Sequence, residues 1–243
     1  MLDVLYEDNH LLAVNKPAML PTMGVAEDRP SLLAVAQQYV RRKYNKPGNV
    51  YLGIVSRLDA PVTGVVLLAR TSKAAGRLSK QFRERDVEKV YWALVEGEVD
   101  PPAGRLTDFL RKDERHRRMH VADANSRGAQ RAELTYRVLC TDKETGRQGD
   151  RERRLQVSRS PGLLPLTLLE VRPLTGRKHQ IRVQLSHAGF PILGDRKYGA
   201  SRPFPQGVAL HARRLVVEHP VSKIQLAIEA PLAASWRRFV EGE

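Results

Sequence analysis

Short apolar runs that stand close together along the sequence constrain the fold of this chain most strongly. Leu2–Tyr6 and His10–Val14 are separated only by Glu7-Asp8-Asn9, which is typical of a β-hairpin. Strand-like runs outnumber helical ones, and neighbouring runs are often too close for a helical crossover between parallel strands. We therefore predict an α+β fold, a single domain over residues 1–243 with a mixed, largely antiparallel sheet flanked by helices.

Helical spacing of apolar residues predicts helices in three places. Pro30 and Ser31 open the first of these segments. Ser72–Arg85 is the second, with Ser72 as its expected N-cap. Gly176–His187 fits both strand and helix periods, and the Thr-Gly pair at its start favours a helix. Further strands are predicted at Tyr51–Val55, Val65–Ala69, Val87–Val99, Arg131–Cys140, Leu163–Arg172 and Gln225–Glu229.

The chain carries a large excess of positive charge. Its 41 Lys and Arg residues against 27 Asp and Glu give a formal net charge of +14 over 243 residues. Such an excess indicates an anionic partner, of which nucleic acid is the leading class. A generally basic surface without a specific ligand and a protein bound to a membrane surface are the alternatives. The basic residues are spread along the chain, which favours a broad docking face over a membrane anchor.

Several classes of protein are disfavoured by the sequence. The single cysteine, Cys140, allows no intrachain disulfide and is expected to be a small buried side chain. No apolar segment reaches the ~20 residues of a membrane span, and the N-terminus does not resemble a signal peptide, so we expect a cytoplasmic monomer. His116 and His120 are four residues apart without a metal-binding motif around them, so no metal site is predicted. No glycine pattern indicates a nucleotide cofactor.

Residues 56–70 contain the candidate for catalysis. Arg57-Leu58-Asp59 follows one apolar run and precedes a second, after a turn containing Pro61 and Gly64. Turns at strand ends are where folds tend to expose reactive side chains. An isolated aspartate in a turn more often accepts hydrogen bonds from its own backbone. On a chain suited to polyanions, a catalytic carboxylate is the competing interpretation.

The chain resembles the RluA family of RNA pseudouridine synthases over about residues 5 to 230. Four stretches carry the resemblance, in the family's order: Glu7 to Pro17, Arg57-Leu58-Asp59 with Thr63-Gly64, Lys89 to Gly97, and Thr175 to Arg182 continuing to Gly194 to Gly199. Leu210-His211-Ala212 and His219-Pro220 are similar to the family's closing segment. The sequence departs from the family pattern at Ser56, where the family often has histidine, and at Val62-Thr63-Gly64, where it has Thr-Ser-Gly.

The resemblance implies the pseudouridine synthase fold and the isomerisation of uridine to pseudouridine in RNA, without a cofactor. It implies that Asp59 is the catalytic carboxylate and that Arg182 pairs with it. It also implies that Tyr91 holds the uracil once the base has left its stack. The plain structural alternatives are a surface arginine at position 182 and a core tyrosine at position 91.

Basic residues within the same motifs are candidates for binding RNA. Arg57 is expected to contact phosphate or to take the place of the flipped base, although an ion pair that stabilises the turn is the alternative. Each of the others is an expected phosphate contact or a solvated charge: Lys89, Arg177, Lys178, Arg196 and Lys197. We expect no small N-terminal RNA-binding (S4-type) domain, so target choice is assigned to the loops Arg111–Arg118 and Asp142–Arg159. Ribosomal RNA is slightly favoured over transfer RNA.

Two other functions remain open from the sequence. One is a non-catalytic RNA-binding protein that retains the synthase fold, which the presence of Asp59, Tyr91 and Arg182 disfavours. The other is a hydrolase that cleaves nucleosides with the same aspartate, because carboxylates also act at the anomeric carbon in glycosidases.

Overall fold

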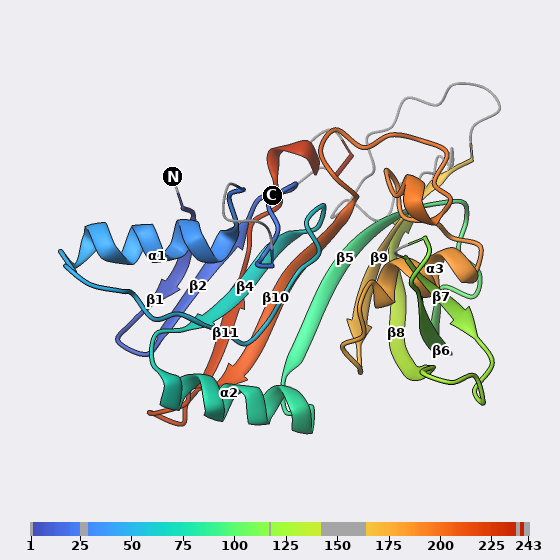
Figure 1. Cartoon of the computed structure of the whole chain (residues 1–243). Coiled ribbons are helices and arrows are strands. Elements are labelled where there is room, and N and C mark those ends of the chain that lie inside the picture. The colour runs from blue at the N-terminus through green and yellow to red at the C-terminus, as the bar shows by residue number, and fades with distance from the viewer. Residues whose placement is uncertain (1, 25–28, 117, 142–163, 237–238, 241–243) are drawn as a thin grey trace. The chain divides into compact units, whose positions relative to one another are not determined.

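The computed structural model describes residues 2–24, 29–116, 118–141, 164–236 and 239–240 (Figure 1). The chain divides into two compact units, which are described separately below. Unit 1 consists of Met1–Lys89 and Ala212–Pro231, and unit 2 of Val90–His211 and Leu232–Glu243. The chain therefore leaves unit 1 after Lys89 and returns to it at Ala212. The single-domain organisation stays a prediction.

Unit 1 is built around antiparallel strands. These are β1 (Val4–Glu7), β2 (Leu11–Lys16), β3 (Gly53–Ile54), β4 (Thr63–Ala69), most of β10 (Leu210–Glu218) and β11 (Gln225–Glu229). β1 pairs with β2, which confirms the predicted hairpin, and β2 pairs with β4 from Leu11↔Ala69 to Lys16↔Gly64. β3 pairs with β4, and β11 pairs with β10. The strand predicted over Tyr51–Val55 is thus reduced to two residues.

Two helices pack against this sheet, α1 (Leu32–Lys43) and α2 (Ser72–Glu84) (Figure 1). Successive residues of a strand point to opposite faces. Accordingly Leu12 packs in one apolar cluster with α1, and Leu11 in another with α2. All seven residues of β4 are buried, because both faces of this strand are covered. Ser31 caps α1, so Pro30 precedes the helix and does not open it, and the predicted cap of α2 is wrong by one residue. Thr71 accepts the hydrogen bond from Ala74 N, and Ser72 is already helical.

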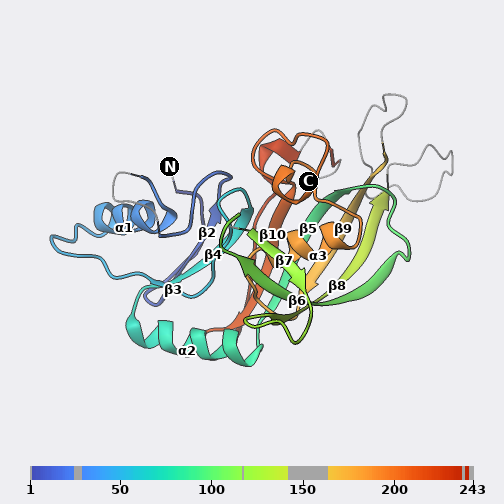
Figure 2. The same cartoon turned by 45° about the vertical axis from the view of Figure 1, so that its right-hand side comes forward.

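Unit 2 contains a second antiparallel arrangement, in the order β5-β9-β8-β6-β7. Its strands are β5 (Glu88–Glu96, which starts in the last residues of unit 1), β6 (Ala103–Asp113), β7 (Arg118–Ala122), β8 (Gln130–Thr141) and β9 (Leu166–Pro173). Helix α3 (Gln180–His187) lies beside β6 and β7, followed by the 3₁₀ turns η1 (Arg196–Tyr198) and η2 (Ala234–Trp236) (Figure 2). The helix predicted within Gly176–His187 is confirmed and begins at Gln180.

These elements confirm the predicted α+β class, although the sequence analysis did not predict β6, β7 or β10. The basic segment Arg111–Arg118 is the end of the β6–β7 hairpin. The other predicted target-selecting loop, residues 142–159, lies outside the described residues. Cys140 is half-buried instead of fully buried, like the other residues at the end of β8 from Val138 to Thr141, and it lies at a β-bulge. Helices long and apolar enough to cross a membrane are absent from the described ranges.

Candidate active site

The loop that carries Asp59 connects β3 to β4 in unit 1, and its backbone is held on both sides of the aspartate. Thr22 Oγ1 donates to the carbonyl of Leu58 at 2.8 Å and accepts from Leu58 N at 3.2 Å. Lys16 Nζ donates to the carbonyl of Ala60 at 3.0 Å. The Asp59 carboxylate is half-buried between these two fixed neighbours. The loop therefore presents one partly accessible carboxylate on a constrained backbone.

The two positions where the chain departs from the family pattern also have defined places in this loop. Ser56 Oγ accepts a hydrogen bond from Leu67 N at 3.0 Å, so the serine joins the loop to β4. Val62 is buried, and its N–H donates to the carbonyl of Asp59 at 3.1 Å. Both residues thus contribute to the shape of the loop around Asp59.

Lys16 is the residue of this region that the sequence analysis did not select. Its side chain is fully buried, and Nζ donates to the carbonyls of Pro17, Leu20 and Ala60 at 2.8, 2.8 and 3.0 Å. Three acceptors match the three N–H groups of an ammonium ion. Burial lowers the pKa of Lys16 to about 7, and the charge of Asp59 opposes this fall. The sequence signals were a lysine at the end of an apolar strand and its place in the Glu7 to Pro17 stretch that resembles the family.

Gly64 follows the loop and allows a close approach of two backbones. It has φ +110°, and a Cβ atom at this position would lie 2.3 Å from the carbonyl oxygen of Ala212. A side chain cannot be accommodated there without moving the backbone of β10. Glycine at position 64 is therefore required by the geometry of the strand that leads away from Asp59.

Arg182 lies on α3 in unit 2 and is buried, which excludes the alternative of a surface arginine. Its Nε and Nη2 atoms donate to the two carboxylate oxygens of Asp195 at 2.7 and 2.8 Å. The guanidinium carbon lies 5.0 Å from the ring centre of Tyr198. The Tyr198 hydroxyl in turn lies 2.6 Å from His179 Nδ1 and accepts from Met119 N. The guanidinium is therefore held in a fixed orientation by a partner, Asp195, that the sequence analysis had not assigned.

Tyr91 lies on β5 opposite Val171 and is half-buried, while Ala93 and Val95 on the same face of the strand are fully buried. The ring is therefore at the edge of the core. Asp59 belongs to unit 1, whereas Tyr91 and Arg182 belong to unit 2. The structure brings Arg182 together with Asp195, and the pairing of Arg182 with Asp59 stays a prediction.

The predicted RNA-binding residues are mostly exposed. Arg57 is exposed beside Asp59 in unit 1. In unit 2, the exposed residues precede α3 or lie on η1, two elements in contact with each other: Arg177, Lys178, Arg196 and Lys197. Lys89 is half-buried, and burial, followed by the charge of Arg85, lowers its pKa to about 8. These positions are compatible with phosphate contacts, which stay a prediction.

Comparison with known proteins identifies the family of this chain. Residues 10–187 match the family described as RNA pseudouridylate synthase. The chain belongs to this family. The resemblance inferred from the motifs is thus confirmed, and the protein is an RNA pseudouridine synthase that acts on RNA.

Relatives of this synthase support the assignment over nearly its whole length. It is 33% identical over 251 residues to "tRNA pseudouridine synthase C" of Salmonella typhi, covering 99% of this chain and 89% of the relative. It is 32% identical over 253 residues to "Ribosomal large subunit pseudouridine synthase D" of Pseudomonas aeruginosa, covering 95% and 68%. Among solved structures, "Human RNA Pseudouridylate Synthase Domain Containing 4" matches with a TM-score of 0.72 and 27% identity, covering 97% of this chain and 92% of that chain.

Proposed function

We propose that this pseudouridine synthase isomerises specific uridines in a structured RNA, with Asp59 as the carboxylate that acts at the ribose of a flipped-out nucleotide. The observation that carries the proposal is the fixed loop around Asp59, which leaves one half-buried carboxylate between two anchored residues. Catalytic groups on a preorganised backbone need little rearrangement before they react.

The isomerisation exchanges one bond to the ribose for another. The N1–C1′ bond breaks, the uracil rotates, and C5 bonds to C1′. C5 then releases its proton to solvent and N1 takes up a proton, so the reaction is redox-neutral and loses no part of the nucleotide. Carboxylates stabilise or attack an anomeric carbon of this kind in glycosidases. Asp59 is assigned that role here.

The other two candidates have supporting roles in this proposal. Arg182, whose orientation is fixed by Asp195, supplies a guanidinium that pairs with Asp59 and keeps it ionised. The half-buried ring of Tyr91 provides a face on which the uracil stacks. The exposed cations near α3 and Arg57 bind the phosphates on either side of the target.

The class of RNA is the finer part of the proposal. Relatives named for transfer RNA and for the large ribosomal subunit match this chain with nearly the same identity, 33% and 32%. They do not separate the two classes, so the preference for ribosomal RNA from the sequence analysis stays a prediction. Transcripts of both classes therefore belong in the test.

Release of tritium from RNA labelled at uridine C5 measures the reaction directly, because the isomerisation expels that hydrogen. Asp59→Asn is expected to lower turnover by about three orders of magnitude or more while RNA affinity is kept. Asp86→Asn, a change at an exposed carboxylate of unit 1, is the matched control and is expected to have wild-type turnover. Turnover retained in Asp59→Asn would refute the assignment. Free uracil among the products would indicate a hydrolase instead.

A further inference from the structure

One face of the sheet in unit 2 gathers arginines that have no role in the proposed active site. Residues paired directly across antiparallel strands share a face. Arg105 is opposite Thr135, Arg137 is opposite Glu170, and Arg172 is opposite Thr135. Alternation along β8 adds Arg131 and Glu133 to the same face. We call this set the arginine face: Arg105, Arg131, Arg137 and Arg172 with Glu133 and Glu170.

The arginine face lies on the opposite side of the β6–β8 strands from α3, which carries Arg182. Ala132 and Leu110 point to the helix side, where they form an apolar cluster with Val183 of α3. Gln184 of α3 donates to the carboxylate of Asp108 on that same side. Because neighbouring residues of a strand alternate, Arg131 and Arg137 project from the other side. The arginines are therefore separate from the residues assigned above.

Each glutamate of the arginine face holds two arginines. Glu133 Oε1 accepts from Arg105 and Arg131 at 2.7 and 2.9 Å. Glu170 Oε1 lies 3.4 Å from Arg137 Nη2 and 3.0 Å from Arg172 Nε. The glutamate side chains are only 7% and 14% exposed, whereas the four arginine side chains are 46–63% exposed. The two carboxylates are thus largely buried between guanidinium groups that are exposed to solvent. The six residues together carry a formal charge of +2.

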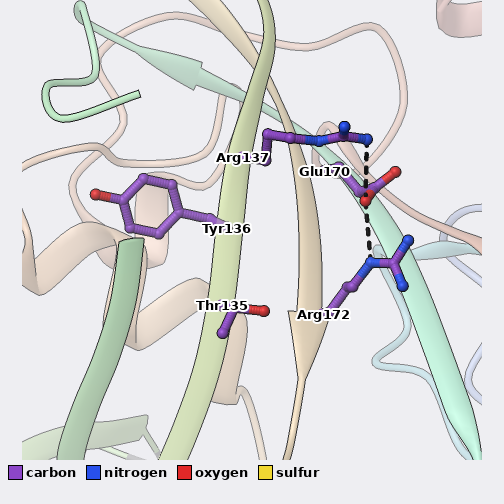
Figure 3. Close-up of a pocket in the computed structure, with 5 residues that line it drawn as sticks. All are labelled: Thr135, Tyr136, Arg137, Glu170 and Arg172. Atoms are coloured by element: carbon purple, nitrogen blue, oxygen red, sulfur yellow. Dashed lines mark hydrogen bonds and ion pairs between the residues drawn. The ribbon is translucent and has the colours of Figure 1, made fainter. Parts of the chain in front are cut away.

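A cavity of about 320 Å³ lies within the arginine face (Figure 3). It is lined by Thr135, Tyr136, Arg137, Glu170 and Arg172, with both arginines reaching the same glutamate in Figure 3. A guanidinium presents five donors in a rigid fork, which suits the tetrahedral oxygens of a phosphate better than an ammonium does. Arginines already held by a glutamate also lose little conformational entropy when they bind a ligand.

We propose that the arginine face binds the phosphate backbone of the substrate RNA, as a second contact region on the side of the β6–β8 strands opposite α3. This inference rests on the proposed function, since RNA is the polyanion that the enzyme must hold. A surface of alternating arginines suits the phosphate backbone of RNA, because guanidinium groups donate to phosphate oxygens whatever the base sequence. An RNA that reaches both sides of these strands must extend beyond the stem that contains the target uridine.

The test compares RNA binding by wild type, Arg137→Gln/Arg172→Gln and Glu170→Gln, using a transfer RNA transcript, a ribosomal RNA fragment and a short stem-loop. The double variant is expected to bind the longer RNA about tenfold more weakly near 0.1 M salt, with a salt slope lower by about one to two. Its affinity for the stem-loop is expected to stay within about twofold of wild type. Glu170→Gln is expected to bind the longer RNA more tightly, because two arginines lose their internal counter-charge.

Two controls keep the result interpretable. Lys80→Gln/Arg83→Gln removes the same charge from exposed positions of α2 in unit 1 and is expected to keep wild-type affinity. The triple variant Arg137→Gln/Glu170→Gln/Arg172→Gln also removes the carboxylate that the double variant leaves without a counter-ion. It is still expected to bind the longer RNA more weakly than wild type does. Equal affinity of wild type and the double variant for every RNA would overturn the inference. If the wild-type enzyme releases no tritium, the proposed function is refuted instead. The binding measurements would still test the role of the arginine face.

Discussion

At the scale of single residues, the sequence identifies the candidate catalytic residues better than the groups that hold them. Asp59 stands in a recognisable motif, whereas the environment of Lys16 is made by carbonyls of Pro17, Leu20 and Ala60, which only the fold brings together. The same holds for Arg182. Its motif is visible in the sequence, but its bidentate partner Asp195 comes from the following loop. Contacts between segments cannot be inferred from spacing within one segment.

Lys16→Met tests whether the buried ammonium positions Asp59. The change leaves three carbonyls at a partly buried site without their donor, so we expect the free energy of unfolding to fall by about 1–3 kcal/mol in a urea titration. We also expect kcat for tritium release to fall at least about tenfold with little change in KM, because Asp59 loses its support but the RNA contacts remain. Lys46→Met, at an exposed site, is the control. Unchanged stability and unchanged kcat together would show that Lys16 has no such role.

Lys89 predicts a pH dependence of RNA binding. Burial and the charge of Arg85 lower the pKa of Lys89 to about 8, so the side chain is charged below that pH and becomes neutral as the pH rises through it. If Lys89 contacts phosphate, RNA affinity should decrease between pH 7 and pH 9. Lys89→Arg should keep its affinity over the same range, since arginine stays protonated. Parallel pH profiles of the two proteins would contradict this role.

At the scale of elements, Glu7 connects β1 to α1 and β4. Its carboxylate accepts hydrogen bonds from Tyr39, Lys43 and Tyr44 at 2.7, 2.6 and 2.8 Å, and lies 3.3 Å from Nη1 of Arg70. Burial favours a higher pKa for Glu7, but the hydrogen bonds from Lys43, Tyr39 and Tyr44 outweigh it and lower the pKa. These contacts of Glu7 fix the position of α1 on the sheet. Apolar contacts alone are less directional and would allow the helix to slide.

Glu7→Gln is expected to reduce the free energy of unfolding by about 2–3 kcal/mol at neutral pH, because Arg70 keeps its buried charge and loses its counter-ion. Since the pKa of Glu7 is lowered on folding, the stabilisation is present above its usual pKa and disappears as the pH falls through the folded value. The difference between wild type and variant should therefore shrink in acid. Glu84→Gln, at an exposed position of α2, should change the free energy of unfolding by less than about 0.5 kcal/mol in the same urea titrations. Equal costs for the two variants would disprove the role of the cluster.

The sequence predicts elements with a clear apolar period and misses those without one. β1, β2, α1 and α2 have such periods, and all four are confirmed, whereas α3 fitted both periods and was predicted from the Thr-Gly pair before it. β6 was missed because only three of its eleven residues are large and apolar, and one of these, Leu110, is fully buried. The strand is specified by its pairing with β8 over eight positions, a long-range property that its own residues do not encode.

At the scale of the whole molecule, the fold of unit 1 depends on how two distant segments of the chain are combined more than on any single element. The core of unit 1 joins Leu11, Val65 and Leu67 from the first segment to Leu215, Val217 and Ile228 from the second. Unit 1 is therefore incomplete without residues 212–231, although 122 residues of unit 2 stand between the segments. Apolar alternation within each segment predicts a strand, but it does not show that the two segments share one core.

A fragment of residues 1–89 should therefore fail to fold, since one side of its core lacks β10 and β11. Joining residues 212–231 to it through a flexible glycine-serine linker should restore a cooperative thermal transition followed by circular dichroism. A linked fragment with the order of residues 212–231 scrambled is the control for added length. Cooperative unfolding of residues 1–89 alone would show that the second segment is dispensable.

The return of the chain to unit 1 also has a consequence for biosynthesis. The candidate site residues, from Arg57 to Lys197, are translated before β10 and β11. Leu215, Val217 and Ile228 of these two strands complete the apolar core that contains Val65 and Leu67 of β4. A product that ends before residue 210 should therefore carry every candidate site residue and still fail to modify RNA.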